Sequence, residues 1–391
     1  MESILEKAFS FIEKEEEVMK QLWFDLTKIE SQSIDREGVN AAVRFLEENL
    51  KKFGMKTKIF DFGKGGNSIT AYFDNKSEQL EMVLLGHLDT VHPTGLFGKE
   101  VIKVDEDNDT AYGPGILDCK GGIIVASFVA RVLEYIGYEK MIKLVFSGDE
   151  EVAHSTTEDM GKNFFLEECK GFKSAIDCET GFVDGRIVVG RKGSASFRMT
   201  IKGKSAHAGN EPQNGISSIR EAANKIIAIE SVNNYENTHY NVGVINGGTS
   251  GGSISEDCVL DIGVRYRKTA ELDNIRKFLQ EITNKSYVDG TNSQLEELRI
   301  FDPMDQTEEN MRLFDIVKEN SEKLGFGTPY PCFLGGASDA AYTVALGIPS
   351  LCAMGVQGYE NHTLRERAVI SSLVKRTKLI VASILSLPEK I

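Results

Sequence analysis

Apolar residues recur at helical spacing over the first ~50 residues of the chain. Phe24, Leu26 and Ile29 mark one such stretch, and Val43 and Leu46 mark a second. Because the α-helix repeats every 3.6 residues, this spacing predicts that the chain begins with helices.

Short apolar runs alternate with a helical pattern in the next part of the chain. The runs at 82–85, 142–146 and 174–176 are typical of buried strands, and the stretch 121–137 is typical of a helix. This alternation predicts a mostly parallel sheet covered by helices, the α/β class.

The pattern changes from about Ser194. It reads in order as a strand, a helix, two strands, a helix and a strand, carried by SFRMTIKG, SSIREAANKIIAIESV, YNVGVING, VLDIGVRYR, LDNIRKFLQEITNK and LEELRIF. The order βαββαβ is that of the ferredoxin-like sandwich. We therefore expect a lid domain at 193–302 inserted into an α/β domain at 1–192 and 303–391, which resumes with the helix NMRLFDIVKENSEKLG and the strand SLCAM.

Charge and cysteine usage narrow the classes of partner. The chain has 45 basic and 59 acidic residues, so its net charge is −14, which disfavours nucleic acid and anionic membranes. Its six cysteines are scattered, it starts without an apolar leader, and no apolar run approaches the ~20 residues of a membrane span. We expect a cytoplasmic protein with free thiols that acts on a small molecule or peptide.

Metal-ligand side chains follow the predicted strands, where open α/β sheets bind their ligands. They are His87 and Asp89, Glu150 and Glu151, Asp177 and Glu179, and the later His362, with Asp118 at the mouth of a helix. Singly, each has a plain structural interpretation, such as a helix cap or a solvated turn. Their joint arrival at one edge of the sheet favours a common site.

Two imidazoles together with several carboxylates suit zinc. There is one carboxylate more than a single ion needs, which predicts two ions with Asp118 as the bridge. One ion would take His87 and Glu179, and the other Glu151 and His362. Two ions about 3.5–4 Å apart lower the pKa of a shared water towards ~7.

Two neighbouring carboxylates are expected to support this centre. Asp89 would accept the second ring N–H of His87 and hold its tautomer. Glu150 and Glu151 are adjacent, and in extended backbone successive side chains point opposite ways. Glu151 can therefore face a metal while Glu150 serves as general base and then general acid.

In order, the motifs GHLDTV, GPGILDCKGG, SGDEE, CET and the late histidine resemble a family of two-zinc exopeptidases and deacylases. That family includes glutamate carboxypeptidase, aminoacylase, acetylornithine deacetylase, succinyl-diaminopimelate desuccinylase and peptidase T. The resemblance spans residues ~20–390, and GGASDAAY looks closest to the glutamate carboxypeptidase branch. It implies a zinc-binding catalytic domain of the zinc exopeptidase type, two Zn²⁺ that Co²⁺ or Mn²⁺ could replace, and a homodimer formed through the lid.

The resemblance also gives roles to residues of the lid and of a glycine-rich segment. His207 in GKSAHAG looks like the histidine that reaches into the partner's site to stabilise the oxyanion. Arg265 looks like the arginine that binds the substrate's free carboxylate. Backbone groups of Gly335 and Gly336, together with Asn246, are expected to line the same pocket.

The chain departs from the family pattern in places. The acidic ligand usually precedes Pro or Thr, and in DCET either Asp177 or Glu179 could fill that place, with Glu179 favoured because Thr180 follows it. Cys119 follows the bridging aspartate and is expected to be a small buried residue. INGGTSGGSIS has no Asn after its glycines, which puts the details of substrate contact in doubt. Three histidines match no family role and are interpreted as surface residues: His92, His154 and His239.

These features predict zinc-dependent hydrolysis of an amide or peptide bond next to a free carboxylate in a small peptide or N-acyl amino acid. A deacetylase or desuccinylase has the same chemistry with another acyl pocket. The alternative from another class is an inactive homologue that serves as a binding protein. Loss of a ligand or of Glu150 would mark that alternative, and neither is lost.

Overall fold

The computed structural model describes residues 2–74 and 76–388, and the chain forms two compact units. The first unit comprises the described residues up to Gly190, Gln306–Phe333, and those from Ser338 onward. The second comprises Arg191–Asp305 and Leu334–Ala337.

A mostly parallel six-stranded sheet forms the centre of the first unit. Its order is β1 (Lys56–Phe60), β2 (Ser68–Tyr72), β6 (Met141–Ser147), β3 (Leu80–His87), β7 (Ser174–Asp177) and β17 (Ser350–Leu351). The last four run parallel, whereas β1 and β2 form an antiparallel edge. The carboxyl ends of β3, β6 and β7 therefore meet at one edge of the sheet, as the sequence predicts.

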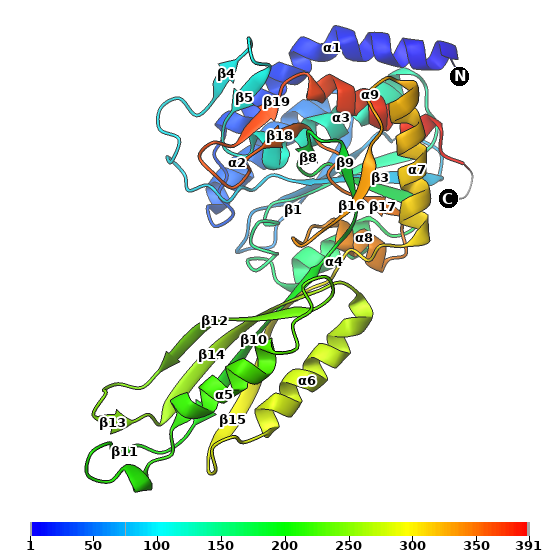
Figure 1. The fold of residues 1–391 in the computed structure, drawn as a ribbon. Helices are drawn as coiled ribbons and strands as arrows, with labels where there is room; N and C mark the ends of the chain where they lie inside the picture. The colour runs from blue at the N-terminus through cyan, green and yellow to red at the C-terminus, as the bar shows by residue number, and fades with distance from the viewer. Residues whose placement is uncertain (1, 75, 389–391) are drawn as a thin grey trace. The chain divides into compact units, whose positions relative to one another are not determined.

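Helices cover both faces of this sheet, with α1, α3 and α9 on one side and α4 and α8 on the other (Figure 1). Helix α3 is apolar around most of its circumference because it packs on β3 and β6 and is covered by α1 and α9. The helices of this unit are α1 (Glu2–Lys28), α2 (Arg36–Lys52), α3 (Gly121–Tyr135), α4 (Asp159–Glu168), α7 (Glu308–Lys323), α8 (Ala340–Ala345) and α9 (Ser372–Leu385).

Short strands that the hydrophobic pattern does not predict complete the first unit. They form a sheet in the order β4 (Lys103–Asp105), β5 (Thr110–Tyr112), β19 (Arg367–Val369), β18 (Gln357–Tyr359) and β8 (Gly181–Phe182), and a pair of β9 (Arg186–Arg191) with β16 (Tyr330–Leu334). The predicted strand SLCAM is too long. It ends at Leu351, because Cys352 instead forms an isolated bridge with Val188.

The second unit has the predicted βαββαβ order. Its elements are β10 (Gly193–Lys202), α5 (Ser218–Glu230), β12 (His239–Gly247), β14 (Asp257–Tyr266), α6 (Leu272–Asn284) and β15 (Asn292–Phe301). All neighbouring strands of the sheet β12-β14-β10-β15 are antiparallel. Helix α6 buries Ile275, Leu279 and Thr283, four residues apart, against this sheet. The α/β class with a ferredoxin-like insertion is thus confirmed.

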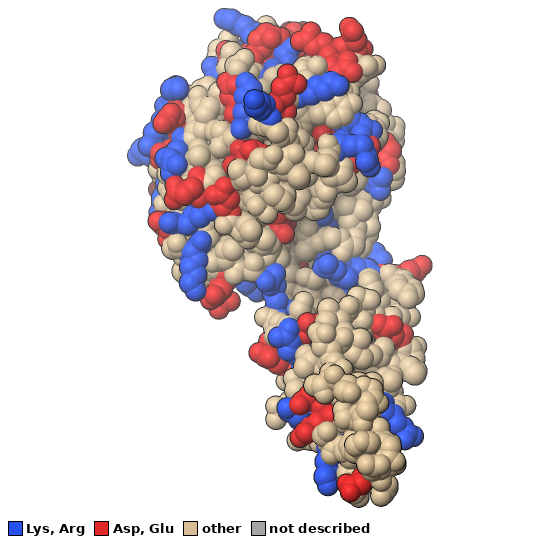
Figure 2. All heavy atoms as spheres, turned by 90° about the vertical axis from the view of Figure 1, so that its left-hand side faces the viewer, with Lys and Arg blue, Asp and Glu red and all other residues tan. Residues whose placement is uncertain are grey.

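Basic and acidic side chains are interspersed on the face shown in Figure 2, and no continuous basic area covers that face. Within the two described ranges, no helix is both long enough and apolar enough to cross a membrane. The six cysteines, all within the described residues, form no disulfide bond, and Cys332 is the one that is not fully buried.

Candidate functional site

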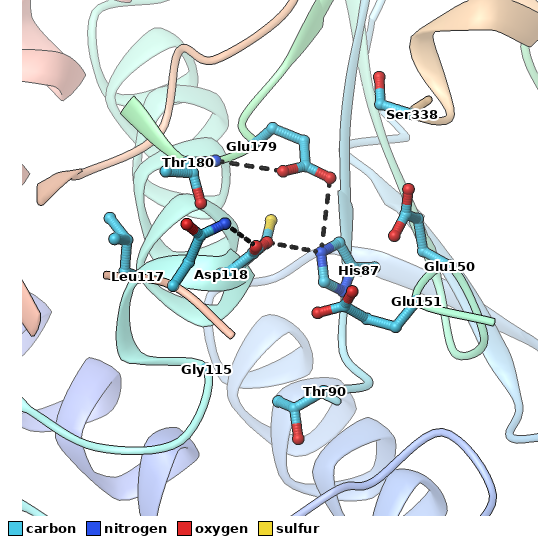
Figure 3. Close-up of polar contacts among 12 residues, drawn as sticks. His87, Thr90, Gly115, Leu117, Asp118, Glu150, Glu151, Glu179, Thr180 and Ser338 are labelled. Carbon is cyan, nitrogen blue, oxygen red and sulfur yellow. Dashed lines mark hydrogen bonds and ion pairs between the residues drawn. The ribbon is translucent and has the colours of Figure 1, made fainter. Parts of the chain in front are cut away.

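Two groups of metal-ligand side chains share Asp118. Figure 3 shows the first group, His87, Asp118 and Glu179, together with Glu151 of the second. In one group, the Nε2 atom of His87 lies 3.1 Å from Oδ1 of Asp118 and 3.5 Å from Oε1 of Glu179. In the other, the Nε2 atom of His362 lies 3.2 Å from Oδ2 of Asp118 and 3.1 Å from Oε2 of Glu151. The two carboxylate oxygens of Asp118 thus face different imidazoles, which is the arrangement of a bridging ligand.

Buried hydrogen bonds hold the backbone of the Asp118 segment. Asp118 lies in the short turn Ile116–Lys120, just before α3. The Glu366 carboxylate accepts hydrogen bonds from the backbone N–H groups of Leu117 and Asp118, both at 3.0 Å, and of Gly115 at 3.2 Å. Nε2 of His92 lies 2.7 Å from the same carboxylate. Glu366 therefore fixes the position from which Asp118 reaches both groups.

Asp89 contacts His87 and also joins two strands, a second role that the sequence does not predict. Nδ1 of His87 lies 3.0 Å from the backbone carbonyl of Asp89 and 3.4 Å from its carboxylate. That carboxylate also accepts the backbone N–H groups of Glu150 and Glu151, each at 3.1 Å, and the hydroxyl of Ser33 at 2.7 Å. Asp89 thus joins the ends of β3 and β6.

Glu179 lies in the cluster, and Asp177 is engaged elsewhere. Asp177 accepts the hydroxyl of Ser338 at 3.0 Å, whereas Glu179 faces His87 and Asp118. A Cβ atom on Gly122 would lie 1.7 Å from the carbonyl oxygen of Cys178, so only glycine lets α3 begin this close to the segment before Glu179. This contact holds Asp118 and Glu179 on neighbouring segments.

Glu150 and Glu151 diverge from adjacent positions, as Figure 3 shows. Burial, and then the Glu179 carboxylate, raise the pKa of Glu150 well above its ordinary value. Burial and the nearby Asp118 raise the pKa of Glu151 to about 7, and its Oε1 atom is buried without a hydrogen-bond partner among the described residues. Divalent cations would offset the crowded negative charge and occupy this oxygen, so the residues fit a metal centre.

Cys119 lies beside the cluster without belonging to it. Its thiol is buried, and its Sγ atom donates to the carbonyl oxygen of Cys178 at 3.4 Å. Burial raises the pKa of this thiol well above its ordinary value, so the group stays protonated. It therefore has the small, buried role that the sequence favours.

The interpretation of His92 and His154 as surface residues is wrong. Both are buried, with exposed fractions of 4% and 3%. Nδ1 of His154 lies 2.9 Å from Asp149, and its Nε2 lies 2.6 Å from Asp339. His239 is half-buried, and its Nδ1 has no hydrogen-bond partner among the described residues. A single histidine forms no hydrophobic pattern from which its burial could be predicted. His92 and His154 each pair with a carboxylate far away along the chain, Glu366 and Asp339, which the sequence does not indicate.

His207 belongs to the second unit, on the two-stranded ladder of β11 (Ala206–His207) and β13 (Ser253–Ile254). Its Nδ1 accepts the backbone N–H groups of Gly209 and Asn210, each at 3.1 Å. A ring nitrogen that accepts hydrogen bonds carries no proton, so the neutral ring carries its proton on Nε2. The exposed edge of His207 is therefore a hydrogen-bond donor.

The other residues expected to contact substrate also lie in the second unit. Arg265 is on β14 directly opposite His239 on β12, and Asn246 is an exposed residue farther along β12. Burial, and then Lys192 and Arg265, lower the pKa of His239. The carbonyl of Gly336 accepts a hydrogen bond from Arg191 at 3.3 Å. Gly335 is the preceding residue, and both glycines are exposed.

The sequence did not reveal the residues that hold the backbone of Asp118, or the neighbour of His362 that bonds to the Asp118 carboxylate. Glu366 and His92 hold the Asp118 segment, and the Nδ2 atom of Asn361 donates to Oδ2 of Asp118 at 2.8 Å. Only Asn361 had a local signal, since it precedes His362 in ENHT. Glu366 lies 248 residues from Asp118 and follows no motif.

Comparison with known proteins finds similarity to peptidases. Residues 189–291 match the M20 peptidase dimerisation domain. Carboxypeptidase G2 of Pseudomonas sp. (strain RS-16) is 26% identical over 367 residues, covering 92% of this chain and 86% of that protein.

Two solved structures share the fold over nearly their whole length. A tripeptidase from Staphylococcus aureus superposes with a TM-score of 0.76 at 22% identity, covering 94% of this chain and 97% of that one. An M20 family metallo-carboxypeptidase from Sulfolobus solfataricus gives a TM-score of 0.70 at 17% identity, covering 94% and 98%. The family resemblance indicated by the motifs is confirmed.

Proposed function

We propose, from the premise that this chain is a metallohydrolase homologous to the M20 peptidases and deacylases, that it hydrolyses an amide or peptide bond next to a free carboxylate. The substrate would be a small peptide or an N-acyl amino acid. The observation that carries the proposal is the position of Asp118, whose two carboxylate oxygens face two separate histidine–carboxylate groups. Metal dependence follows from the homologues and this donor set.

The residues at hand would hold two zinc ions, with cobalt or manganese as substitutes. His87 and Glu179 would serve one ion, Glu151 and His362 the other, and Asp118 both. When bound, such ions polarise the scissile carbonyl and make a water molecule acidic enough to react at neutral pH. Asp177 is the weaker candidate for a ligand because its carboxylate already accepts Ser338.

Glu150 is the proton carrier in this proposal. It is anchored through its backbone N–H to Asp89, while its side chain diverges from Glu151 and stays outside both ligand groups (Figure 3). A carboxylate whose pKa is raised above its ordinary value is suited to take a proton from water and return it to the leaving amine. Asp89 positions both glutamates by accepting their N–H groups.

The second unit would supply the contacts that select substrate. His207 donates from Nε2, which suits stabilisation of an oxyanion. Arg265 offers a guanidinium for the free carboxylate, with Asn246 and the backbone at Gly336 as further contacts. The match to a peptidase dimerisation domain over 189–291 supports a homodimer, in which His207 would act on the partner's site.

The experiment that tests the function combines metal analysis with a substrate panel. Purified protein should contain close to two divalent ions per chain, and a chelator should abolish hydrolysis that zinc, cobalt or manganese restores. Dipeptides, tripeptides and N-acetyl or N-succinyl amino acids separate peptidase from deacylase activity. Folded protein without metal that hydrolyses none of them, yet binds one tightly, would favour the inactive-homologue interpretation. The expected cytoplasmic location stays a prediction.

A further inference from the structure

The first unit contains a cavity of about 570 Å³ that none of the roles above uses. Most of its lining residues belong to the β8–β9 turn, the end of α7 with the loop that follows it, and the start of α9. Its volume is within the range of small-molecule sites. The metal-ligand residues are absent from its lining.

Arg376 lines this cavity as a buried cation without a counter-charge. Its exposed fraction is 6%, and it has no hydrogen bond or ion pair with any residue in the described ranges. Burial lowers the pKa of its guanidinium to about 10. Because buried charges in proteins are normally paired, a guanidinium in this setting indicates an anion that the chain itself does not supply.

The remaining lining residues define the kind of anion. Lys375 adds a second positive charge, and the one acidic lining residue, Asp184, already pairs with Arg186 at 3.0 Å. Phe326, which is exposed, gives the cavity one apolar wall beside the largely buried Leu379. A guanidinium fork binds carboxylate or phosphate through two parallel hydrogen bonds, and the apolar wall favours a ligand with an apolar body.

The cavity borders the segment that carries Glu179. A Cβ atom on Gly181 would lie 3.2 Å from Nη2 of Arg376, so the guanidinium packs directly on the backbone of β8. The same segment is held by hydrogen bonds from Gly181 to Val356 and from Gly355 to Glu179, at 2.8 and 2.9 Å. Gly181, Gly355 and Val356 are themselves absent from the cavity lining, so an occupant would reach this segment only through Arg376.

We propose that this cavity is a second binding site, for a small organic anion whose carboxylate or phosphate pairs with Arg376 and whose apolar part lies along Phe326 and Leu379. This site is independent of the hydrolytic centre. Its test is therefore a binding measurement, and loss of hydrolysis would not affect it.

The probe is 4-fluorobenzoate, followed by ¹⁹F NMR on the full-length protein. Saturable binding is expected for the wild type, with affinity at least about 10-fold weaker in Arg376→Met because the fork is removed. Lys378→Met is the matched control, since Lys378 is a cation on the same helix outside the cavity lining and should leave the affinity unchanged. Arg376→Met should also raise the Tm in the absence of probe, because it removes an unpaired buried charge.

A second variant covers the case in which Arg376→Met does not fold. Thr328 is an exposed residue of the cavity lining, so Thr328→Trp should fill the cavity and weaken binding while Arg376 stays in place. If inorganic phosphate displaces the probe, the site prefers a phosphate ligand. If the probe stays bound, the site prefers a carboxylate. Equal affinity in wild type and both variants would overturn the proposal, as would binding that disappears on metal chelation and survives Arg376→Met.

Discussion

At the scale of single residues, the site depends on which carboxylates hold metal and which one stays outside the ligand groups. Glu150→Gln removes the proposed proton carrier without changing either ligand group, so metal content should be unchanged while kcat falls by about 10²–10⁴-fold. Metal analysis and steady-state kinetics measure the two quantities. Glu167→Gln, on the exposed face of α4, is the control and should behave as wild type. Unchanged turnover in Glu150→Gln would remove this residue from the mechanism.

A second residue-scale prediction separates the two acidic positions of DCET. Glu179→Gln should lower the metal content of purified protein towards one ion per chain, because Glu179 faces His87 and Asp118. Asp177→Asn should keep both ions, since this side chain bonds to Ser338. Mass spectrometry under native conditions counts the ions. The opposite pattern would show that Asp177 is the ligand.

At the scale of elements, a strand could be predicted from the sequence only where its apolar run was long enough. Strands β3, β6 and β7 contain apolar runs long enough to be recognised, so the side chains that follow them could be assigned to one edge of the sheet. Strands β8 and β18 have two and three residues, which is too short for any period to appear. Glu366 was missed because Asp118, whose backbone N–H it accepts, lies 248 residues away along the chain. Arg376 was missed because it packs on the backbone of β8 and belongs to no motif.

The turn that carries Asp118 depends on the Glu366 carboxylate. Glu366→Gln replaces one acceptor oxygen by an amide that cannot accept the surrounding N–H groups, which should lower the free energy of unfolding by about 1–3 kcal/mol. The same variant should bind metal more weakly, because the backbone of Asp118 is released. Chemical denaturation and metal titration measure the two effects. Glu319→Gln, on the surface of α7, is the control, and equal losses in both variants would contradict the role of Glu366.

The loop after β6 is joined to the start of α8 by His154, which lies between Asp149 and Asp339. Burial opposes its charge, but these two carboxylates hold its pKa well above 6.5 in the folded state. A histidine with a raised folded pKa stabilises the protein fully below its unfolded pKa of about 6.5, and this stabilisation is lost as pH rises through the folded value. The Tm difference between wild type and His154→Gln should therefore be widest near pH 6 and narrow steadily above it. A difference that does not change with pH would mean that His154 is neutral when folded.

At the scale of the whole molecule, the peptidase dimerisation domain at 189–291 bears on whether one chain can complete a site. The first unit holds every proposed metal ligand, whereas His207 and Arg265 belong to the second unit. If the second unit serves the partner's centre, two inactive variants damaged in different units should restore each other in a mixed dimer.

His207→Ala and Glu150→Ala are the pair for this test. In a mixed dimer, one site combines the intact Glu150 of the first chain with the intact His207 of the second, while the other site lacks both groups. Dimers isolated through two different affinity tags should therefore have about half the wild-type activity per dimer, whereas each variant alone stays nearly inactive. Two variants damaged in the same unit, Glu150→Ala and Glu179→Gln, are the control: both lesions lie in the metal-binding unit, one in each site, so their mixed dimer should remain inactive. A mixed dimer of the first pair that stays as inactive as its parents would mean that His207 serves its own chain.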